Sequence, residues 1–277
     1  MVKTLRDKTN CGFMDCKKAL KETEGDLEKA VAYLRQKGIA VAGKRAERAT
    51  SEGVVLAQVA GDGLSGVLLE VNCESDFVAK TEAFQNFAQL LAAQIATAAP
   101  AQVDALLAQP WQPQPSLTVQ DYLNELIGQT GENIRVRRFS RFAGRGLVGA
   151  YIHFGGRIGV LLELSSAKVT PELTTLAKDL AMQVAASNPL AVTREDVDPA
   201  VIAQETAIYQ AQARESGKPE KIIERMVTGR LDKFFKEFCL VEQPFVKNPD
   251  ITVAQLLKEA GGAELRVVRF TRYQLGT

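Results

Sequence analysis

Two stretches of the chain, Gly66-Val-Leu-Leu-Glu-Val71 and Gly159-Val-Leu-Leu-Glu-Leu164, are nearly identical and lie 93 residues apart. Each is preceded by a second glycine-led segment at the same offset, Gly53-Val-Val and Gly146-Leu-Val. Short apolar runs joined through glycine-containing turns are typical of β-hairpins. The two stretches therefore predict two hairpins of the same design, and their match indicates an internal duplication.

Three further blocks match in the same order along the chain. They are Ala93-Gln-Ile-Ala96 with Met182-Gln-Val-Ala185, Leu117-Thr-Val119 with Ile251-Thr-Val253, and Ile134-Arg-Val-Arg-Arg-Phe-Ser-Arg-Phe142 with Leu265-Arg-Val-Val-Arg-Phe-Thr-Arg-Tyr273. Four ordered blocks predict two copies of one α+β unit and not a solenoid of many repeats. Each unit is expected to contain a hairpin, a helix, a second short helix and a closing strand.

The expected strands cover residues 54–59, 67–72 and 133–142 in the first copy, and 147–154, 158–164 and 264–273 in the second. The closing strands alternate apolar residues with arginine, which is the pattern of an antiparallel strand with one solvated face. We therefore expect a three-stranded antiparallel sheet in each unit, with helices on one face.

The first 50 residues form a separate basic unit, with 12 Lys and Arg against 7 Asp and Glu. Helix stop signals and an Asp26 N-cap predict three short helices over residues 2–8, 13–23 and 26–36, with Gly38 just past the last. Residues 43–50 are expected to be a charged linker. The expected core of this unit consists of Leu5, Phe13, Met14, Ala19, Leu20, Leu27, Ala30, Val31 and Leu34.

The predicted organisation is therefore α+β in three parts: residues 1–50, a first core unit over 51–142 and a second over 143–277. The second unit is longer by about 45 residues, which predict a helical hairpin inserted over about residues 190–242. Two interpretations of this hairpin stay open, a contact with a second copy or another partner, or a self-contained hairpin. The first unit has Pro110-Trp-Gln-Pro-Gln-Pro115 in the matching place, interpreted as a spacer, with polyproline recognition as the weaker alternative.

Composition excludes several classes of protein. The chain of 277 residues has 46% hydrophobic and 24% charged residues, an ordinary globular composition. A net charge of +1 cannot hold nucleic acid unaided. The sequence shows no membrane span and no secretory signal, so a cytoplasmic location is expected. Cysteines 11, 16, 73 and 239 have neither a metal-site nor a disulfide spacing, which predicts reduced thiols.

The chain carries no recognisable catalytic or cofactor motif. It lacks a phosphate-binding loop and a nucleophile elbow. Gly155-Gly156 is interpreted as a turn and Gly261-Gly262 as a helix C-cap. His153 is the single histidine and lies on a predicted strand, so a structural or contact role is favoured over a catalytic one. We expect no enzymatic activity, no cofactor, no metal site and no direct nucleotide binding.

The two copies differ again after the second strand, where the first copy is four residues longer. The longer loop contains Ser75-Asp-Phe-Val78, where the second copy has Ser165-Ser-Ala-Lys168. A carboxylate beside a large aromatic ring at a loop tip is typical of a binding anchor. The alternative is that Phe77 folds back onto Phe84 and Phe87 as a staple, and the pattern alone leaves the two open.

Several motifs together resemble the bacterial and organellar translation elongation factor Ts family. In collinear order they are Met14-Asp-Cys-Lys-Lys-Ala-Leu20, Gly25-Asp-Leu-Glu-Lys-Ala30, Glu70-Val-Asn-Cys-Glu-Ser-Asp-Phe-Val-Ala-Lys80, Ala185-Ala-Ser187, Gly217-Lys-Pro219 and Gln243-Pro-Phe-Val246. The resemblance implies that the N-terminal helices are a ubiquitin-associated-like domain. It also implies that the duplicated units are the two core subdomains of the family and that the insertion is its coiled-coil or dimerisation module.

The resemblance implies a guanine-nucleotide exchange factor that binds elongation factor Tu in its GDP-bound and nucleotide-free forms and promotes release of GDP and Mg²⁺. The family's loop reads Thr-Asp-Phe-Val, and here Ser75, Asp76, Phe77 and Val78 match it, with Ser75 keeping the hydroxyl. Phe77 would wedge into the G domain of the partner. Asp76 and Ser75 would disturb the groups that position the nucleotide-bound Mg²⁺.

Secondary partner contacts are implied at Met14, Lys17, His153, Gly155, Gly156, Arg157 and Ile158. Longer family members add a C-terminal helical module, a contact not expected for a chain ending at Thr277. The alternative function is a non-catalytic RNA- or ribosome-binding module that uses the arginine-rich closing strands. We expect instead that the aromatic rings of those strands are buried against helices. The residues are Phe139, Phe142, Phe270 and Tyr273.

Overall fold

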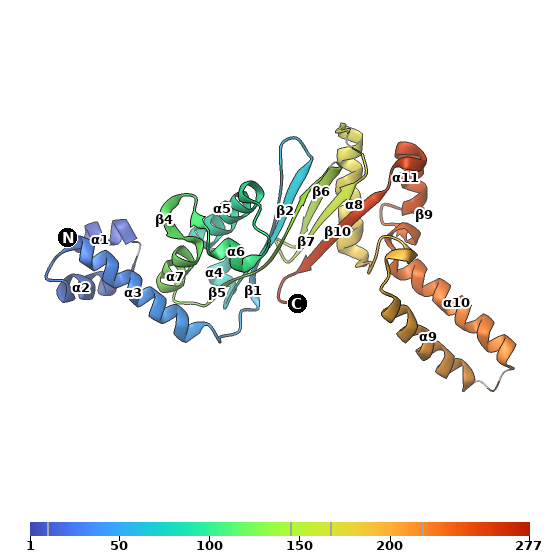
Figure 1. The fold of residues 1–277 in the computed structure, drawn as a ribbon, viewed down its shortest axis with the longest axis horizontal. Helices are drawn as coiled ribbons and strands as arrows, with labels where there is room; N and C mark the ends of the chain where they lie inside the picture. The colour runs from blue at the N-terminus through green and yellow to red at the C-terminus, as the bar shows by residue number, and fades with distance from the viewer. Residues whose placement is uncertain (10, 145, 167, 216, 218) are drawn as a thin grey trace.

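The structure is a computed structural model that describes residues 1–9, 11–144, 146–166, 168–215, 217 and 219–277. The molecule is elongated, with the N-terminal helices at one end and the helical insertion at the other (Figure 1). Two three-stranded sheets lie between these ends (Figure 1). Within the described part of the chain, no helix is both long enough and apolar enough to cross a bilayer.

Three helices form the N-terminal unit: α1 (Val2–Thr9), α2 (Phe13–Glu22) and α3 (Leu27–Arg45). The Asp26 carboxylate caps α3 by accepting hydrogen bonds from the N–H groups of Glu28 and Lys29. The core of the unit is built on Leu5, Cys16, Ala19, Leu20, Ala30 and Leu34. Phe13 and Met14 were expected in this core, but both side chains are exposed, at the first two positions of α2.

The third helix is longer than predicted, because it continues through Gly38 to Arg45. Gly38 does not end the helix. It lies where α3 crosses α7 (Val119–Thr130), and a Cβ at Gly38 would lie 3.3 Å from the Asn124 carbonyl oxygen. The absence of a side chain lets the two backbones approach closely. The first three residues of the predicted charged linker, 43–45, are therefore helix, and α3 fastens the N-terminal unit to the first core unit.

The two sheets confirm the predicted strands to within a few residues. The first has the order β1-β2-β5, with β1 Glu52–Val59, β2 Ser65–Cys73 and β5 Ile134–Ala143. The second has the order β10-β7-β6, with β6 Leu147–His153, β7 Ile158–Leu164 and β10 Val267–Gln274. All pairs are antiparallel, and the equivalent pairs Val54 with Val71 and Leu147 with Leu164 face each other across the two hairpins.

Helices cover one face of each sheet, as predicted. The other sheet covers part of the opposite face, which was not predicted, and Arg135 and Arg137 of β5 stay exposed. Helices α5 (Glu82–Ala98) and α7 pack with the first sheet, and α8 (Pro171–Ser187) and α11 (Val253–Gly261) with the second. The opposite faces of the two sheets contact each other through a shared cluster that includes Val55, Leu68, Leu161, Phe142 and Tyr273. The rings of Phe142 and Tyr273 are thus buried between sheets and not against helices.

A small hairpin directly precedes the last α-helix of each unit and was not predicted. In the first unit it pairs β3 (Pro110–Trp111) with β4 (Gln114–Thr118), after the short helix α6 (Val103–Leu107). Trp111 is buried against Phe87 and Tyr122, with ring centres 5.6 and 4.9 Å away. The hairpin pairing and the buried Trp111 contradict the interpretation of this segment as a spacer. Pro110, Pro113 and Pro115 are exposed, and polyproline recognition stays a prediction.

The second unit repeats this hairpin with β8 (Pro244–Phe245) and β9 (Asn248–Thr252). A buried glutamine holds each hairpin by two hydrogen bonds. Gln94 donates to the Pro110 carbonyl oxygen at 3.0 Å and accepts from the Gln112 N–H at 3.1 Å. Gln183 makes the equivalent bonds with Pro244 and Val246, at 3.2 and 2.6 Å.

The insertion is a helical hairpin, as predicted, formed by α9 (Pro199–Arg214) and α10 (Glu220–Phe238). It encloses two small apolar clusters, one at its base around Phe234 and one around Ile223 and Val227. The described residues also include three short 3-10 helices, at Arg194–Asp196, Leu240–Glu242 and Gly262–Glu264.

Candidate functional site

The longer loop of the first unit folds into one helical turn, α4 (Asp76–Ala79), directly after β2. Ser75 is its N-cap, with Oγ accepting a hydrogen bond from the Val78 N–H at 3.3 Å. Val78 and Ala79 are buried in the core of the first unit. The inward side of this turn is therefore fixed, and its tip faces outward.

A glutamate that is distant along the chain fixes the start of the α4 turn by hydrogen bonds. The Glu132 carboxylate accepts from the Ser75 N–H at 2.9 Å and from the Ser75 hydroxyl at 2.6 Å. Next to it, Glu74 accepts from the Asn133 N–H at 2.7 Å. Cys73 is buried beneath the loop, and this burial raises the pKa of its thiol to about 12. Hydrogen bonds to Glu132 and Asn133 thus fix the residues that precede the exposed tip of the loop.

Phe77 is the most exposed large apolar residue described, with 81% of its surface accessible. Phe84 and Phe87 are both fully buried. The alternative in which Phe77 folds back onto them is therefore wrong. Asp76 lies beside Phe77, and its carboxylate accepts a hydrogen bond from the Lys80 ammonium group at 2.6 Å. This hydrogen bond lowers the pKa of the Asp76 carboxyl. The tip offers one phenyl ring and one carboxylate to a binding partner.

The four predicted loop residues have different environments. Asp76 and Phe77 project from the tip, whereas the Ser75 hydroxyl is occupied by Glu132 and the Val78 N–H. The Val78 side chain is only 9% exposed. Asp76 and Phe77 are therefore available for contact, and Ser75 and Val78 position them.

The turn between β6 and β7 carries a second exposed ring. Phe154 is 72% exposed and has a left-handed backbone, with φ of 50°, and Gly155 and Gly156 continue with φ of 62° and 96°. The centre of the His153 ring lies 3.9 Å from that of Phe154, and its Nδ1 is hydrogen-bonded to the Tyr151 hydroxyl at 3.0 Å. His153 thus packs against the exposed ring, in line with a structural or contact role.

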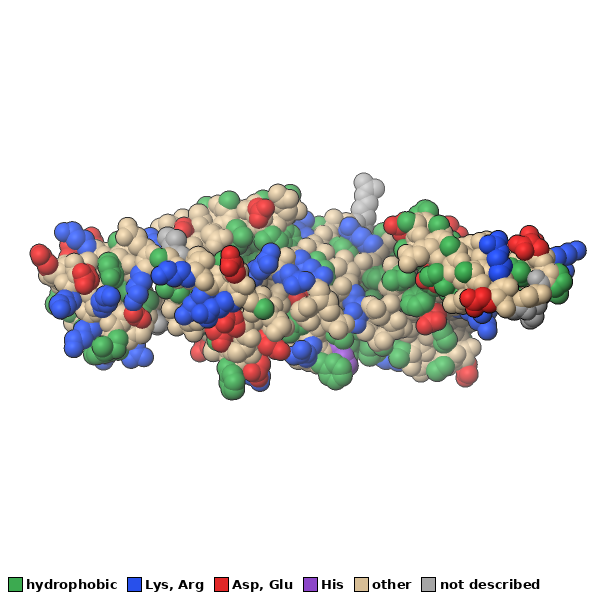
Figure 2. All heavy atoms as spheres, turned by 90° about the horizontal axis from the view of Figure 1, so that it is seen from below, with side chains coloured by type: hydrophobic (Ala, Val, Ile, Leu, Met, Phe, Trp, Pro, Cys, Tyr) green, Lys and Arg blue, Asp and Glu red, His purple; other side chains and the backbone are tan. Residues whose placement is uncertain are grey.

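Strand β1 supports both the α4 loop and this turn. The Val55 N–H donates to the Gly156 carbonyl oxygen at 2.7 Å, and Arg157 pairs with Glu52 at 3.1 Å. A Cβ at Gly156 would lie 2.7 Å from Val54, so only glycine allows this approach. The α4 turn packs on β1 and β2. Figure 2 shows the histidine, in purple, beside one hydrophobic protrusion, with a second protrusion on the same face nearer the N-terminal unit.

The remaining predicted contact residues are distributed over two elements. Met14 is 71% exposed, and Lys17 is exposed one turn further along α2. Ile158 begins β7 and packs partly against the core of the second unit. Sequence reasoning left Phe154 out of the predicted contact residues and placed Phe13, which is 55% exposed, in the N-terminal core. A ring directly before two turn glycines is a signal that could have identified Phe154.

Two arginines of the closing strands pair with buried glutamates, whereas Arg135 and Arg266 are exposed. Arg138 pairs with Glu70 and Arg269 with Glu163, each at 2.7 Å. In the described part of the chain, no group of three or more His, Cys, Asp or Glu side chains is placed to hold a metal ion. The four cysteines are free thiols, and three of them are buried.

Comparison with known proteins gives one consistent family. The sequence pattern of the family described as Elongation factor TS matches residues 74–277. The chain is 46% identical over 280 residues to elongation factor Ts of Clostridium novyi (strain NT), covering 100% of this chain and 92% of that protein. This chain belongs to the elongation factor Ts family. The family resemblance read from the sequence is confirmed, and with it a place in protein biosynthesis among elongation factors associated with guanine-nucleotide exchange.

Other members of the elongation factor Ts family match over the same length. That of Clostridium botulinum (strain ATCC 19397 / Type A) is 46% identical over 280 residues, covering 100% of this chain and 91% of the relative. That of Trichlorobacter lovleyi is 45% identical over 283 residues, covering 99% of this chain and 91% of the relative. The family pattern begins at Glu74, so it includes the α4 loop. The full-length matches extend the relationship to the N-terminal unit.

Proposed function

We propose that this chain is the guanine-nucleotide exchange factor of elongation factor Tu, which it binds in the GDP-bound state to accelerate loss of GDP and Mg²⁺ in the cytoplasm. The observation that carries the proposal is Phe77, 81% exposed at the tip of a loop held by Glu132. An exposed ring on a fixed loop is an anchor that loses little conformational entropy on binding. The family relationship supplies the partner.

Exchange requires no covalent chemistry. It requires that the factor bind the nucleotide-free partner more tightly than the nucleotide-bound one, and by linkage each ligand then weakens the other by the same factor. An acceleration of about 10⁴-fold corresponds to about 5.5 kcal/mol at the barrier. One buried aromatic anchor supplies about 2–4 kcal/mol. Phe77 therefore acts together with Asp76, whose carboxylate would compete for the groups that position Mg²⁺.

The second exposed ring extends this surface. Phe154 and the turn around it rest on the same strand as α4, so both turns meet the partner as one rigid face. On α2, Met14 and Lys17 would hold another side of the G domain. The alternative of RNA binding by the closing strands is disfavoured because Arg138 and Arg269 already pair with buried glutamates. Dimerisation through the α9–α10 hairpin stays a prediction.

The test is release of fluorescent GDP from elongation factor Tu by stopped flow, with excess unlabelled GDP and fixed Mg²⁺. Wild type is compared with Phe77→Ala, Asp76→Ala and Phe154→Ala. Wild type should accelerate release, Phe77→Ala should lose about 30-fold or more of the acceleration, and the other two should lose less. Ile222→Ala is the matched control, because Ile222 is also an exposed apolar residue, 45% accessible, on α10 in the insertion.

Circular dichroism and urea midpoints establish that each variant is folded. Release that folded wild type does not accelerate would refute exchange on this partner. Acceleration that survives both Phe77→Ala and Asp76→Ala would place the decisive contact on α2 or on the Phe154 turn. Equal losses in Phe77→Ala and Ile222→Ala would show that the effect is not specific to the α4 loop.

A further inference from the structure

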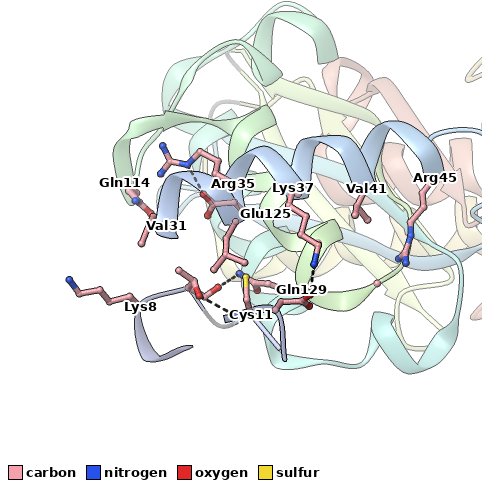
Figure 3. Close-up of a pocket in the computed structure, with 16 residues that line it drawn as sticks. Lys8, Cys11, Val31, Arg35, Lys37, Val41, Arg45, Gln114, Glu125 and Gln129 are labelled. Carbon is pink, nitrogen blue, oxygen red and sulfur yellow. Dashed lines mark hydrogen bonds and ion pairs between the residues drawn. The ribbon is translucent and has the colours of Figure 1, made fainter. Parts of the chain in front are cut away.

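A cavity of about 430 Å³ lies between the N-terminal helices and α7 (Figure 3). One wall comes from α1, α2 and α3, and the other from α7, together with Gln114 of β4. The volume is within the range that binds small molecules in proteins. The cavity is separate from the α4 loop and from the Phe154 turn, since neither contributes to its lining.

Most of the charges around this cavity are already compensated. Arg35 pairs with Glu125 at 3.1 Å, and Lys37 pairs with Asp15. Arg45 has no ion pair among the described residues. Its Nη1 is buried and has no hydrogen-bond partner in the described part of the chain. A partly enclosed guanidinium without a counter-charge is costly, and an anion in the adjoining cavity would supply that counter-charge.

The position of Arg45 explains how this unpaired cation is held. Its Nη1 lies over the C-terminal end of α7, where a Cβ at Gly131 would come within 3.3 Å of it. The negative end of the α7 dipole attracts the guanidinium without supplying a hydrogen bond to Nη1. Figure 3 shows Lys37 and Arg45 extending from α3 toward the same side, whereas Lys8 extends away from the other labelled side chains.

The rest of the lining is partly apolar. Val31, Leu34 and Val41 of α3 contribute side chains, and Gly38 and Gly128 bring bare backbone to the wall. Such a lining suits the hydrocarbon part of a small molecule, and a few convergent polar groups suit its charged end.

We propose that this cavity binds a small organic anion, whose carboxylate or phosphate group pairs with Arg45 and whose apolar part lies against Val41, one turn earlier on α3. Guanidinium groups recognise both carboxylate and phosphate by paired, charge-assisted hydrogen bonds. Because the walls belong to two different units, the bound anion bridges the N-terminal helices and the first core unit. Its binding stabilises the docked arrangement of these units by linkage.

The experiment is a titration of the whole ¹⁵N-labelled chain, followed by amide NMR shifts, with phenyl phosphate, benzoate and phenol as separate probes. Phenyl phosphate and benzoate distinguish a phosphate from a carboxylate ligand, and phenol is the uncharged match. The variants are Arg45→Gln and, as control, Lys44→Gln, which removes the same charge from the next, exposed residue of α3.

One anion or both should bind saturably to wild type and shift the amides of Gly128 and Gly131, and phenol should bind at least about tenfold more weakly. Arg45→Gln should raise the dissociation constant about tenfold or more, and Lys44→Gln less than about twofold. Absence of saturable binding, equal binding of phenol, or equal effects of the two substitutions would overturn the proposal. If Arg45→Gln does not fold, the amide shifts of the wild-type chain test the proposal. Anion binding that leaves the Gly128 and Gly131 amides unshifted would overturn the proposal.

Discussion

The guanidinium carbon of Arg138 lies 4.4 Å from the centre of the Tyr273 ring, which joins the closing strand of the first core unit to that of the second. The reverse contact is also present, with Arg269 lying 4.1 Å from the centre of the Phe142 ring. Each arginine also donates from Nε to a buried glutamate of its own unit at 2.7 Å. Each core unit therefore places an arginine over an aromatic ring of the other unit, and we expect the two units to unfold together.

Substitution of Arg138 by Met should destabilise the chain by about 2–4 kcal/mol, because it leaves the fully buried Glu70 without its closest charged donor. Urea unfolding followed by circular dichroism measures the loss. Arg135→Met, at an exposed position of the same strand, is the control and should change stability little. Equal midpoints for the two variants would contradict this account of Glu70.

Substitution of Glu132 by Ala should loosen the α4 loop without removing a group from its tip, because both acceptor bonds to Ser75 are lost. We expect a loss of about 1–3 kcal/mol and faster hydrogen exchange at the Ser75 and Val78 amides. Under the proposed function, nucleotide release should slow as well. Glu47→Ala, at an exposed glutamate, is the comparison, and unchanged exchange protection in Glu132→Ala would rule out the hold of Glu132 on Ser75.

Substitution of Gly38 by Leu should force α3 away from α7, since even a Cβ there would lie 3.3 Å from the Asn124 carbonyl oxygen. The expected cost is about 1–3 kcal/mol, or partial undocking of the N-terminal unit. Gly43→Leu is a close control, because a Cβ at Gly43 of the same helix meets nothing within 4 Å. That variant should be neutral or slightly stabilising, since leucine favours a helix more than glycine does. Differential scanning calorimetry compares the two, and an equal effect would refute a close crossing at Gly38.

The base of the insertion should respond to acid. The Nη2 of Arg194 donates to Glu242 at 2.7 Å, and the hydrogen bonding from Arg194 lowers the pKa of the Glu242 carboxyl. A carboxyl with a lowered folded-state pKa contributes stability that is present above its unfolded value, about 4.3, and lost as the pH falls through the folded value. Glu242→Gln should therefore destabilise the chain at neutral pH, and its difference from wild type should shrink as the pH falls below about 4.3.

Urea midpoints across this pH range test the acid response. The control is Glu259→Gln, at an exposed site on α11. A difference between wild type and Glu242→Gln that stays constant from neutral to acid pH would show that the ion pair contributes nothing to folding.

The sequence was sufficient for the strands and the duplication, because both rest on local pattern. The face expected to be solvated is partly covered by the other sheet, and residues 66–71 contain the reason. Val67, Leu68 and Leu69 are all buried in succession, a continuous run that is typical of a strand covered on both faces. The end of α3 was also mispredicted. Glycine is the usual helix C-cap, and no local signal distinguishes that use of Gly38 from its use at a helix crossing.

The candidate site was only partly predictable. The loop at Ser75–Val78 was found because it interrupts the repeat, and the exposure of Phe77 needed the structure to decide it. The role of Glu132 could not be read from the chain, because 57 residues separate it from Ser75 and no pattern links them. Phe154 lies in a turn that sequence analysis considered, but its projection depends on a left-handed backbone before two glycines.

The α9–α10 hairpin leaves the second core unit and returns to it at one place. Ala191 and Cys239 form a parallel bridge, and the Leu240 N–H donates to the Ala191 carbonyl oxygen at 2.9 Å. The entry and exit of the insertion are thus adjacent, and the helix before it and the small hairpin after it keep the arrangement of the first unit. Such a junction makes the insertion a modular cassette. It can be shortened, replaced by a brief linker or exchanged for another domain in protein engineering or in evolution, while the duplicated scaffold stays closed beneath it.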